Sequence, residues 1–318
     1  MSNKIKKLRI FITGGAGFIG SNLTNELIKR GNKITIYDNL SSGRLEFLEP
    51  YLKTKKVKLI KGDILDFPKL KKAIKGHDLV FHLAANPNIS QGILDPTIDL
   101  KIGILGTFNV LNAMRLASVK KIAYTSGSGV YGDQGEKFIK ENFGPLLPVS
   151  MYGASKIASE ALVSTFCHFY DMQAWIFRPA NIVGKNQTHG VVFDFIKKLR
   201  KNPKELYILG NGKQSKCYLH VSDLINAMIL AIEKSNERIN LFNVASKSFL
   251  TVNEIAKMII REMNLKNVKI EYSGENVGWK GDVPKVRLDI QRLTKLGWKA
   301  KMNSKQAVLR AIKELLCK

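Results

Sequence analysis

Cysteine is scarce in this sequence of 318 residues, which contains only Cys167, Cys217 and Cys317. The three lie far apart, without a C-x-x-C pair or a neighbouring cluster of histidines. Disulfide frameworks and structural zinc sites are built from characteristically spaced cysteines. We therefore expect three free thiols and no metal site.

Long hydrophobic runs are also missing. A helix that spans a bilayer needs about 20 apolar residues in succession, and no stretch is that long. The apolar run from Leu8 to Thr13 is too short for the core of a secretory signal, and glycines follow it where a cleavage site would stand. These absences argue against a membrane partner and predict a cytoplasmic location.

Acidic residues are outnumbered, because 26 Asp and Glu stand against 51 Lys and Arg and give a net charge of +25. Such a surface attracts phosphate groups and raises the question of nucleic acid. The lysines, however, are spread over predicted helices and loops, and no helix-turn-helix, zinc-finger or RNP motif accompanies them. We predict no nucleic-acid partner and attribute the charge to a general preference for lysine.

Short β-rich runs alternate with helical patterns in the first half of the chain, which is typical of a parallel sheet covered by helices. Strands are predicted at 9–13, 33–37, 57–61, 79–83 and 121–126, with helices at 19–30, 67–74, 104–117 and 152–170. The second half is less regular, with strands predicted at 175–178 and 242–244 and amphipathic helices at 191–201, 222–234 and 253–262. No Pro/Gly-rich linker separates the halves, so we expect one compact unit.

A glycine-rich turn follows the first predicted strand. Gly14, Gly17 and Gly20 occupy the three glycine positions of GxxGxxG, directly before a predicted helix. Glycine permits the tight turn and the close approach of a pyrophosphate to the helix N-terminus. The motif alone is weak evidence for a dinucleotide, but its place between a strand and a helix strengthens it.

Two aspartates bear on the identity of this dinucleotide. Asp38 ends the second strand, where a carboxylate accepts hydrogen bonds from the adenosine ribose and repels a 2′-phosphate, which favours NAD over NADP. Alternatively, Asp38 has only a structural role in the turn that follows the strand. Asp63 follows the third strand, where it can receive the adenine amino group or cap a helix N-terminus.

Tyr152 and Lys156 have the spacing Tyr-x-x-x-Lys, which places a phenol and an ammonium on one face of a helix. A phenol titrates near pH ~10, so a neighbouring cation must lower its pKa before it serves as a base near neutral pH. Lys156 can supply that charge and also hold the nicotinamide ribose. Such pairs occur by chance on amphipathic helices, but a position after five predicted strands favours a catalytic role.

With motifs farther along the chain, these residues resemble the NAD-dependent epimerase/dehydratase branch of the extended short-chain dehydrogenase/reductase family, and within it the UDP-glucose 4-epimerases. The matching segments follow the family's order over nearly the whole length: 14–20 (GGAGFIG), 38–39 (DN), 62–63 (GD), 82–85 (HLAA), 124–132 (YTSGSGVYG), 152–156 (YGASK), 178–181 (RPAN), 220–223 (HVSD) and 281–284 (GDVP). The predicted fold class is α/β. Residues 1–175 are expected to form a Rossmann domain, a doubly wound parallel sheet that binds NAD. Residues 176–318 are expected to form mainly a smaller C-terminal α/β substrate-binding lobe, with some segments returning to the sheet.

The resemblance implies a tightly held NAD that is recycled within each turnover. Tyr152 would take the proton of the sugar 4-hydroxyl while a hydride passes from C4 to the nicotinamide. The 4-keto sugar would then turn and receive the hydride on its other face. The leading function is 4-epimerisation of a UDP-hexose, UDP-glucose/UDP-galactose or their N-acetylated counterparts. The alternatives are another sugar-nucleotide oxidoreductase or dehydratase of the family, or a catalytically impaired NAD-binding sensor.

The same resemblance assigns the site residues. The catalytic group is expected to comprise Tyr152, Lys156, Ser126 and Ser128. NAD is expected to contact Gly14, Gly17, Phe18, Ile19, Gly20, Asp38, Asn39, Ser42, Gly43, Asp63, Ile64, Leu83, Ala84, Ala85, Thr125, Tyr152, Lys156 and Ala180. The UDP-sugar is expected to contact Asn86, Ser128, Tyr152, Asn181, Val191, Val192, Tyr207, Leu209, Lys216, Tyr218 and Asp282.

The sequence departs from the family pattern beside the catalytic pair. Where relatives carry a Ser or Thr three residues before Val-Tyr-Gly, this chain has Gly127, which leaves Ser126, Ser128 or a water to take that place. Dehydratases carry an Asp-Glu pair, and decarboxylases a Glu, where Ser128 and Gly129 stand here. Both of those reactions are therefore disfavoured.

Other departures concern the sugar nucleotide. Lys216 replaces an arginine, which keeps the charge without the bidentate fork, and Val277 or Trp279 replaces another. The diphosphate clamp is therefore expected to be thin. Val286 stands where a bulky tyrosine is associated with the exclusion of N-acetyl sugars, so we expect N-acetylhexosamine nucleotides to fit.

Relatives commonly dimerise through the helices that correspond to 104–117 and 152–170, which form a four-helix bundle. Phe166, Phe169 and Tyr170 lie on or near that face, although burial in the core of one chain explains them equally. A homodimer is expected from the resemblance.

Overall fold

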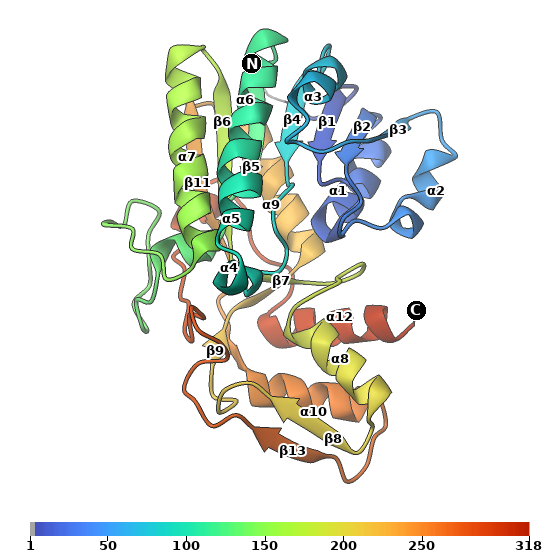
Figure 1. The fold of residues 1–318 in the computed structure, drawn as a ribbon, viewed down its shortest axis with the longest axis vertical. Helices are drawn as coiled ribbons and strands as arrows, with labels where there is room; N and C mark the ends of the chain where they lie inside the picture. Colours follow the sequence, from blue (N-terminus) through green and yellow to red (C-terminus); the bar gives the residue numbers. More distant parts are fainter. Residues whose placement is uncertain (1–3, 318) are drawn as a thin grey trace.

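One seven-stranded parallel sheet forms the larger lobe of the computed structural model, which describes residues 4–317 (Figure 1). The strands lie in the order β3-β2-β1-β4-β5-β6-β11. Their bounds are β1 (Arg9–Thr13), β2 (Lys33–Asp38), β3 (Val57–Lys61), β4 (Leu79–His82), β5 (Lys121–Thr125), β6 (Gln173–Pro179) and β11 (Ile239–Val244). The order reverses between β1 and β4, and in open α/β sheets ligands bind at such a switch point, beyond the carboxyl ends of the strands.

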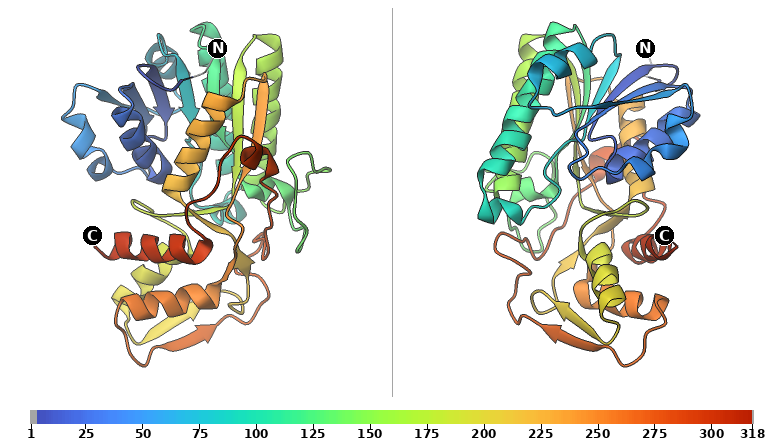
Figure 2. Two further views of the ribbon diagram at one scale, coloured as in Figure 1. Left: turned by 180° about the vertical axis from the view of Figure 1, so that it is seen from behind. Right: turned by 45° about the vertical axis from the view of Figure 1, so that its right-hand side comes forward.

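Helices cover both faces of this sheet (Figures 1 and 2). One face carries α1 (Phe18–Lys29) and α9 (Val221–Lys234), and the other carries α3 (Phe67–Ala73), α6 (Gly106–Leu116) and α7 (Met151–Phe169). Along β1, Ile10 and Ile12 belong to the core on the α1 side and Phe11 to the core on the α6 side. Strands buried on both faces are apolar throughout, which is why apolar runs predicted them. The doubly wound α/β fold class is confirmed.

The smaller lobe lies beyond the carboxyl ends of the strands (Figure 1). Its core is formed by α8 (Val191–Lys201), β8 (Glu205–Ile208), α10 (Val252–Glu262), β13 (Lys269–Tyr272) and α12 (Ser304–Leu316). Two short pairs complete it, β7 (Asn181–Val183) with β10 (Tyr218–His220) and β9 (Ser215–Lys216) with β12 (Leu250–Thr251). Reciprocal capping boxes begin α10 and α12.

Short elements fill the connections: η1 (Leu45–Phe47), α2 (Glu49–Leu52), α4 (Gln91–Leu94), α5 (Thr97–Asp99), η3 (Ser128–Tyr131) and α11 (Gln291–Lys295). The start predicted for the helix at 104–117 was wrong, because Leu100–Leu105 forms a π-helix and α6 begins at Gly106. The sequence did not predict α12 or the pair of β8 with β13. No helix within residues 4–317 has the length and apolar character that crossing a membrane requires.

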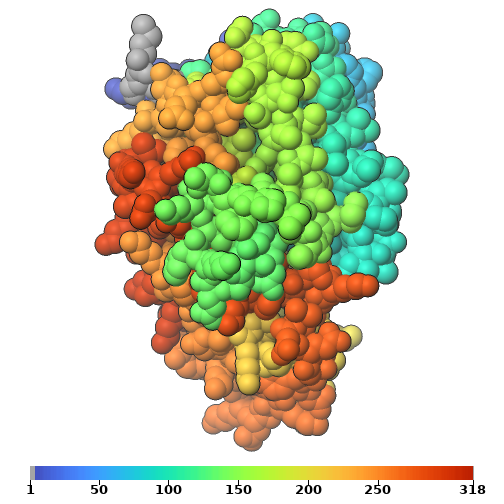
Figure 3. Space-filling view, turned by 90° about the vertical axis from the view of Figure 1, so that its left-hand side faces the viewer, coloured from blue at the N-terminus to red at the C-terminus, as the bar shows by residue number. Residues whose placement is uncertain are grey.

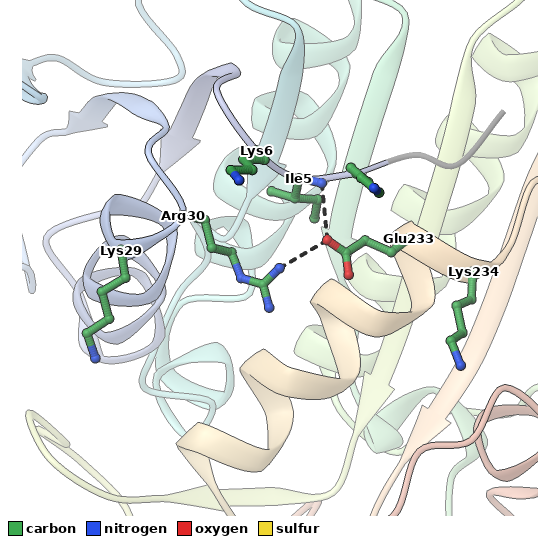
Figure 4. A pocket seen from close by; sticks show the side chains of 7 residues that line it. Ile5, Lys6, Lys29, Arg30, Glu233 and Lys234 are labelled. Carbon is green, nitrogen blue, oxygen red and sulfur yellow. Dashed lines mark hydrogen bonds and ion pairs between the residues drawn. The ribbon is translucent and has the colours of Figure 1, made fainter.

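A clamp at the amino ends of the strands joins three segments. The Glu233 carboxylate of α9 accepts hydrogen bonds from the Ile5 backbone N–H at 3.2 Å and from the Arg30 guanidinium at 3.0 Å. Figure 4 shows these contacts, in a cleft of about 500 Å³ whose lysine side chains point apart. The clamp fixes the chain that leads into β1 against α1 and α9, far from the carboxyl ends of the strands.

Candidate active site

The glycine turn after β1 needs its glycines. Gly14 has a φ of +68°, and a Cβ there would lie 2.8 Å from the Ala84 backbone nitrogen. A Cβ on Gly20 would lie 2.4 Å from the Gly14 carbonyl oxygen, whereas at Gly17 the nearest atom would be that same oxygen at 3.3 Å. The turn is thus packed on its inner side and open at Gly17, the N-cap of α1.

The N-terminus of α1 has the chemistry of an anion site. No side chain caps it, and its first turn contains no acidic residue. Its free N–H groups and the positive end of the helix dipole therefore face the opening at Gly17. Phe18 is buried in the first turn of this helix. A dinucleotide pyrophosphate fits this arrangement, which no other group of the described chain fills.

Asp38 joins two loops at the end of β2. Its carboxylate accepts hydrogen bonds from the Ala16 N–H at 2.9 Å and from the Leu40 N–H at 2.8 Å. Burial raises the pKa of Asp38, although these two N–H groups oppose the rise. Gly43 passes so close that a Cβ would lie 2.8 Å from the carboxylate. The bond from the Leu40 N–H makes Asp38 a turn aspartate. The bond from the Ala16 N–H also places Asp38 beside the glycine turn, where the adenosine ribose was predicted to bind.

Asn39, the residue after Asp38, holds Asp63 in place. Asp63 accepts hydrogen bonds from the Asn39 side chain at 2.9 Å and from the Leu65 N–H at 2.8 Å. The alternative that Asp63 caps a helix was wrong, because Asp66 caps α3 by accepting a bond from the Lys69 N–H. Asp63 thus remains at the edge of the predicted adenine site.

The segment after β4 is anchored to β1. The Thr13 hydroxyl lies 2.7 Å from Nδ1 of His82 and accepts bonds from the Leu83 and Ala84 N–H groups. Burial lowers the pKa of His82 to about 3, so this imidazole is neutral. These bonds hold Leu83 and Ala84 against the glycine turn.

The catalytic pair lies at the start of α7, whose N-cap Ser150 accepts a bond from the Gly153 N–H at 3.1 Å. Lys156 donates to the Thr125 carbonyl at 2.8 Å, and its Nζ lies 5.3 Å from the centre of the Tyr152 ring. Burial lowers the pKa of Lys156 to about 8, while Glu160 opposes the shift. The pair predicted from spacing is therefore assembled.

The predicted pKa of the phenol was wrong in direction. Burial raises the pKa of Tyr152 above its usual range, and the carboxylate of Asp99 raises it further. The ammonium of Lys156 does not outweigh these effects in the protein alone. Spacing could not reveal the burial, and Asp99 was not recognised as a neighbour of the pair.

Two unpaired hydroxyl groups and a glycine lie at the end of β5, the strand whose last carbonyl binds Lys156. The Thr125 and Ser126 hydroxyls are buried and have no hydrogen-bond partner within residues 4–317. A Cβ on Gly127 would lie 3.8 Å from the Tyr152 hydroxyl, so the position that relatives fill with Ser or Thr does face the phenol. Ser128 is half-buried and begins η3. Buried polar atoms without partners are costly, and the hydroxyls of a ligand would satisfy them.

Several residues predicted to hold the sugar nucleotide lie on the short strand pairs of the smaller lobe. Asn181 stands opposite Tyr218 in the pair of β7 with β10, and Lys216 of β9 lies nearby in the chain. Lys216 and Asp282, both predicted to contact the ligand, form an ion pair at 2.5 Å. A ligand that binds either side chain must therefore break or share this pair.

The other residues predicted to contact the sugar nucleotide differ in their exposure to solvent. Tyr207 and Leu209 are 43% and 48% exposed, so both can contact a base. Val191 is half-buried, but Val192 is fully buried in the core of the smaller lobe, which leaves only its backbone for a ligand. Asn86 is also buried and donates to Asp99 at 3.3 Å.

The arrangement combines a phenol, a buried ammonium and an open anion site at the carboxyl ends of β1, β4 and β5. Such a site can move a proton to and from an alcohol beside a bound dinucleotide. No cluster of three or more metal-binding side chains occurs in the part of the chain that the structure describes. The chemistry this geometry supports is oxidation and reduction of a carbinol carbon.

Comparison with known proteins agrees with this geometry. Residues 10–245 match the NAD dependent epimerase/dehydratase family. The chain is 34% identical over 231 residues to the UDP-glucose 4-epimerase of Mycolicibacterium smegmatis, covering 70% of this chain and 73% of that protein. It is 32% identical over 308 residues to the UDP-N-acetyl-alpha-D-glucosaminuronate decarboxylase of Bacillus cytotoxicus, covering 91% and 92%. A crystal structure of a UDP-galactose 4-epimerase superposes with a TM-score of 0.88 at 34% identity, covering 98% and 99%.

Proposed function

This chain belongs to the NAD dependent epimerase/dehydratase family of enzymes, and from that premise we propose that it is an NAD-dependent 4-epimerase of a UDP-hexose. The observation that carries the proposal is the Tyr152–Lys156 pair, faced at the end of β5 by Gly127 rather than by a carboxyl group. Ser128 and Gly129, which follow, have no carboxyl group either, and Asp99, the carboxylate that acts on Tyr152, is only 1% exposed. Elimination of water needs a second acid or base that can contact the substrate.

The cofactor would be held at the switch point. Gly14, Gly17 and Gly20 leave the N-terminus of α1 open to the pyrophosphate, Asp38 would accept the adenosine ribose hydroxyls, and Lys156 would hold the nicotinamide ribose. When bound there, NAD would supply a hydride acceptor and donor, and the overall reaction would be redox-neutral.

The chain itself would supply the proton transfers. Tyr152 accepts the proton of the sugar 4-hydroxyl as C4 is oxidised and gives it back when C4 is reduced on its other face. The phenol of Tyr152 can act near neutral pH only if positive charge lowers its pKa, because burial raises it in the protein alone. Lys156 provides one such charge, and its Nζ is fixed by the Thr125 carbonyl.

The proposed substrate class is a UDP-sugar. Asn181 and Lys216 would bind its diphosphate, with Lys216 leaving or sharing its ion pair with Asp282, and Tyr207 and Leu209 offer exposed surface to a base. Val286, which is partly buried against the core, has a smaller side chain than the tyrosine associated with exclusion of N-acetyl sugars. We therefore include N-acetylhexosamine nucleotides among the substrates. The Bacillus cytotoxicus relative, whose name specifies an N-acetylated sugar nucleotide, supports this choice.

A substrate panel tests the reaction. The protein would be incubated with NAD and each of UDP-glucose, UDP-galactose, UDP-GlcNAc, UDP-GalNAc, UDP-glucuronic acid and dTDP-glucose, and the products followed by NMR. Interconversion at C4 is expected with the UDP-hexoses. Release of CO₂ from UDP-glucuronic acid, or a 4-keto-6-deoxy product from dTDP-glucose, would overturn the epimerase proposal in favour of another reaction of the family. Turnover of UDP-glucose without UDP-GlcNAc would refute the N-acetyl assignment.

Tyr152→Phe separates an enzyme from a sensor. The variant should lose turnover by at least about 100-fold, because the proton acceptor is gone, while its affinity for NAD stays near that of the wild type. NAD affinity would be measured by quenching of tryptophan fluorescence. If neither protein turns over any sugar nucleotide but both bind NAD, the non-catalytic sensor is the better description.

A homodimer is also proposed. Apolar side chains lie exposed along the flank formed by the π-helix, α6 and α7, namely Leu105, Phe108, Leu116 and Phe169. Figure 3 shows α6 and α7 side by side on this surface. Of the aromatic residues predicted there, Phe166 is buried between Phe108 and Tyr170, and Phe169 is 72% exposed. Exposed apolar side chains gathered on neighbouring helices favour a protein interface at this flank.

A further inference from the structure

Asp99 is a buried carboxylate near the catalytic pair to which the proposed reaction gives no role. It is 1% exposed, and its Oδ1 accepts a hydrogen bond from the Asn86 side chain at 3.3 Å. Its Oδ2 is buried without a hydrogen-bond partner within residues 4–317. Burial raises the pKa of Asp99, whereas the Asn86 hydrogen bond and the positive charge of Lys156 oppose the rise, so Lys156 favours the charged carboxylate.

The backbone around Asp99 holds it in a fixed place. Asp99 ends α5 immediately before the π-helix Leu100–Leu105, and both segments pack against α7. Gly92 of α4 covers the carboxylate so closely that a Cβ would lie 2.8 Å from Oδ2. On the other side, a Cβ on Gly103 would lie 2.6 Å from the Ser155 hydroxyl of α7. Single π-turns inside helices are frequent at functional sites, and this one presses the segment of Asp99 onto the helix that carries the catalytic pair.

Apart from carboxylates, the described groups that contact Lys156 carry no charge. The Lys156 ammonium has one hydrogen bond among the described residues, to the Thr125 carbonyl at 2.8 Å, and lies 5.0 Å from the centre of the Tyr124 ring. His82 of β4 is neutral, because burial lowers its pKa to about 3. Burial also keeps Tyr124 of β5 a neutral phenol by raising its pKa.

Two carboxylates act on Lys156, and one of them is already engaged. Glu160, one turn along α7, receives two hydrogen bonds from Arg178, at 2.9 Å and 2.5 Å. Among the described residues, no cation donates a hydrogen bond to Asp99. Asp99 is also the charged group that acts on Tyr152 from outside α7.

We propose that Asp99 is a positioning residue for catalysis: its buried carboxylate, packed against the start of α7, is the counter-charge of the Lys156 ammonium beside Tyr152. The kinetic consequence rests on the proposed function, whereas the effect of Asp99 on Lys156 does not.

The sign of the effect follows from charge alone. A negative neighbour favours the protonated form of both groups, so it raises the pKa of Lys156 and the pKa of Tyr152. Asp99→Asn removes that charge with almost no change of shape, so both pKa values should fall. In the profile of kcat against pH, the rising limb reports Tyr152 and the falling limb reports Lys156. Both limbs should therefore move to lower pH, by about 0.5 to 1 pH unit. A purely structural role would lower kcat at every pH without moving the limbs.

The kinetic experiment compares the wild type, Asp99→Asn and the matched control Asp95→Asn over the pH range in which all three stay folded. Asp95 is exposed, four residues earlier in the same segment, and its side chain bonds Thr97. The control should keep both limbs of the wild-type profile. Limbs that stay in place in Asp99→Asn, or move to higher pH, would overturn the proposal.

An NMR titration reads the charge without any sugar substrate. Lysine labelled with ¹³C at Cε would be followed against pH, with the Lys156 signal assigned by its loss in Lys156→Arg. The pKa of Lys156 should fall in Asp99→Asn and stay unchanged in Asp95→Asn. Asp99→Ser, also neutral but smaller, serves if the asparagine variant does not fold. A lowered pKa in a protein that turns over no sugar nucleotide would refute the proposed function and support the role of Asp99, whereas an unchanged pKa would overturn that role alone.

Discussion

Gly127 leaves one side of the catalytic phenol without a protein hydroxyl. Its φ of −176° is extended backbone that any residue adopts, and a Cβ there would make ordinary contact with Tyr152, at 3.7 Å from the ring and 3.8 Å from the hydroxyl. The neighbouring Ser126 hydroxyl is buried and unpaired within the described residues. Space and backbone conformation therefore both permit a serine at position 127.

Gly127→Ser should raise kcat of the proposed epimerisation by about tenfold. The added hydroxyl would donate to the sugar oxygen as charge develops on it, and donors so placed act mainly in the transition state. Steady-state kinetics with UDP-galactose would measure the gain. Gly129→Ser is the matched control, since a Cβ there would meet only the Gly153 backbone, at 3.9 Å. An unchanged or lower kcat in Gly127→Ser, with NAD affinity intact, would show that Ser126 or a water already fills the role.

At the residue scale, the sequence predicted the relations that are local in the chain. Tyr152 and Lys156 are one helical turn apart, and the three glycines lie within one turn, so spacing alone brings each set together. Asp99 was missed because only the packing of α5 against α7 makes it a neighbour of the pair. The pKa of Tyr152 was predicted in the wrong direction for the same reason, since burial is a property of the packed structure.

Among the elements, α7 is the one on which the site depends most, and a buried ion pair fixes it to the sheet. The Arg178 guanidinium of β6 donates to both oxygens of Glu160, at 2.9 Å and 2.5 Å, and to the Tyr131 hydroxyl at 2.8 Å. The Arg178 and Glu160 side chains are 4% and 11% exposed. Breaking such a pair leaves an uncompensated charge in a region that water does not reach.

Glu160→Ala should lower the free energy of unfolding by about 3 to 5 kcal/mol. Urea unfolding followed by circular dichroism would measure the change. Glu46→Ala is the control, because its pair with Arg44 is exposed, with side chains 51% and 62% accessible, and should contribute less than about 1 kcal/mol. If both substitutions lower the free energy of unfolding equally, the buried ion pair stabilises the fold no more than an exposed one does.

At the scale of elements, prediction succeeded where a short apolar run marks a strand or a regular amphipathic period marks a helix. All seven strands of the sheet and helices such as α8 and α9 carry such patterns. The π-helix at Leu100–Leu105 was not predicted, because one extra residue in a turn leaves no distinct pattern of apolar residues. The pair of β8 with β13 joins short segments about 60 residues apart, and no local signal marks such a pairing.

The whole molecule places its site between two lobes and leaves one flank apolar. The sugar-nucleotide side of the site is carried by segments of the smaller lobe, while the catalytic pair lies on α7 of the larger lobe. With the π-helix and α6, α7 also forms the flank on which Leu105, Phe108 and Phe169 are exposed. A partner that covers this flank would therefore brace the helix that carries Tyr152 and Lys156.

Charge placed on this flank should separate the subunits of the proposed homodimer. The double variant Phe108→Lys and Phe169→Lys puts two positive charges on each copy, and the two-fold symmetry of a dimer brings like charges together. Light scattering after size exclusion should show the mass of two chains for the wild type and of one chain for the variant. Leu45→Lys replaces a side chain of similar exposure, 47%, on the opposite side of the sheet and should stay dimeric. A wild type with the mass of one chain would refute the dimer. A dissociated variant that also loses turnover would show that bracing α7 from outside supports the catalytic pair.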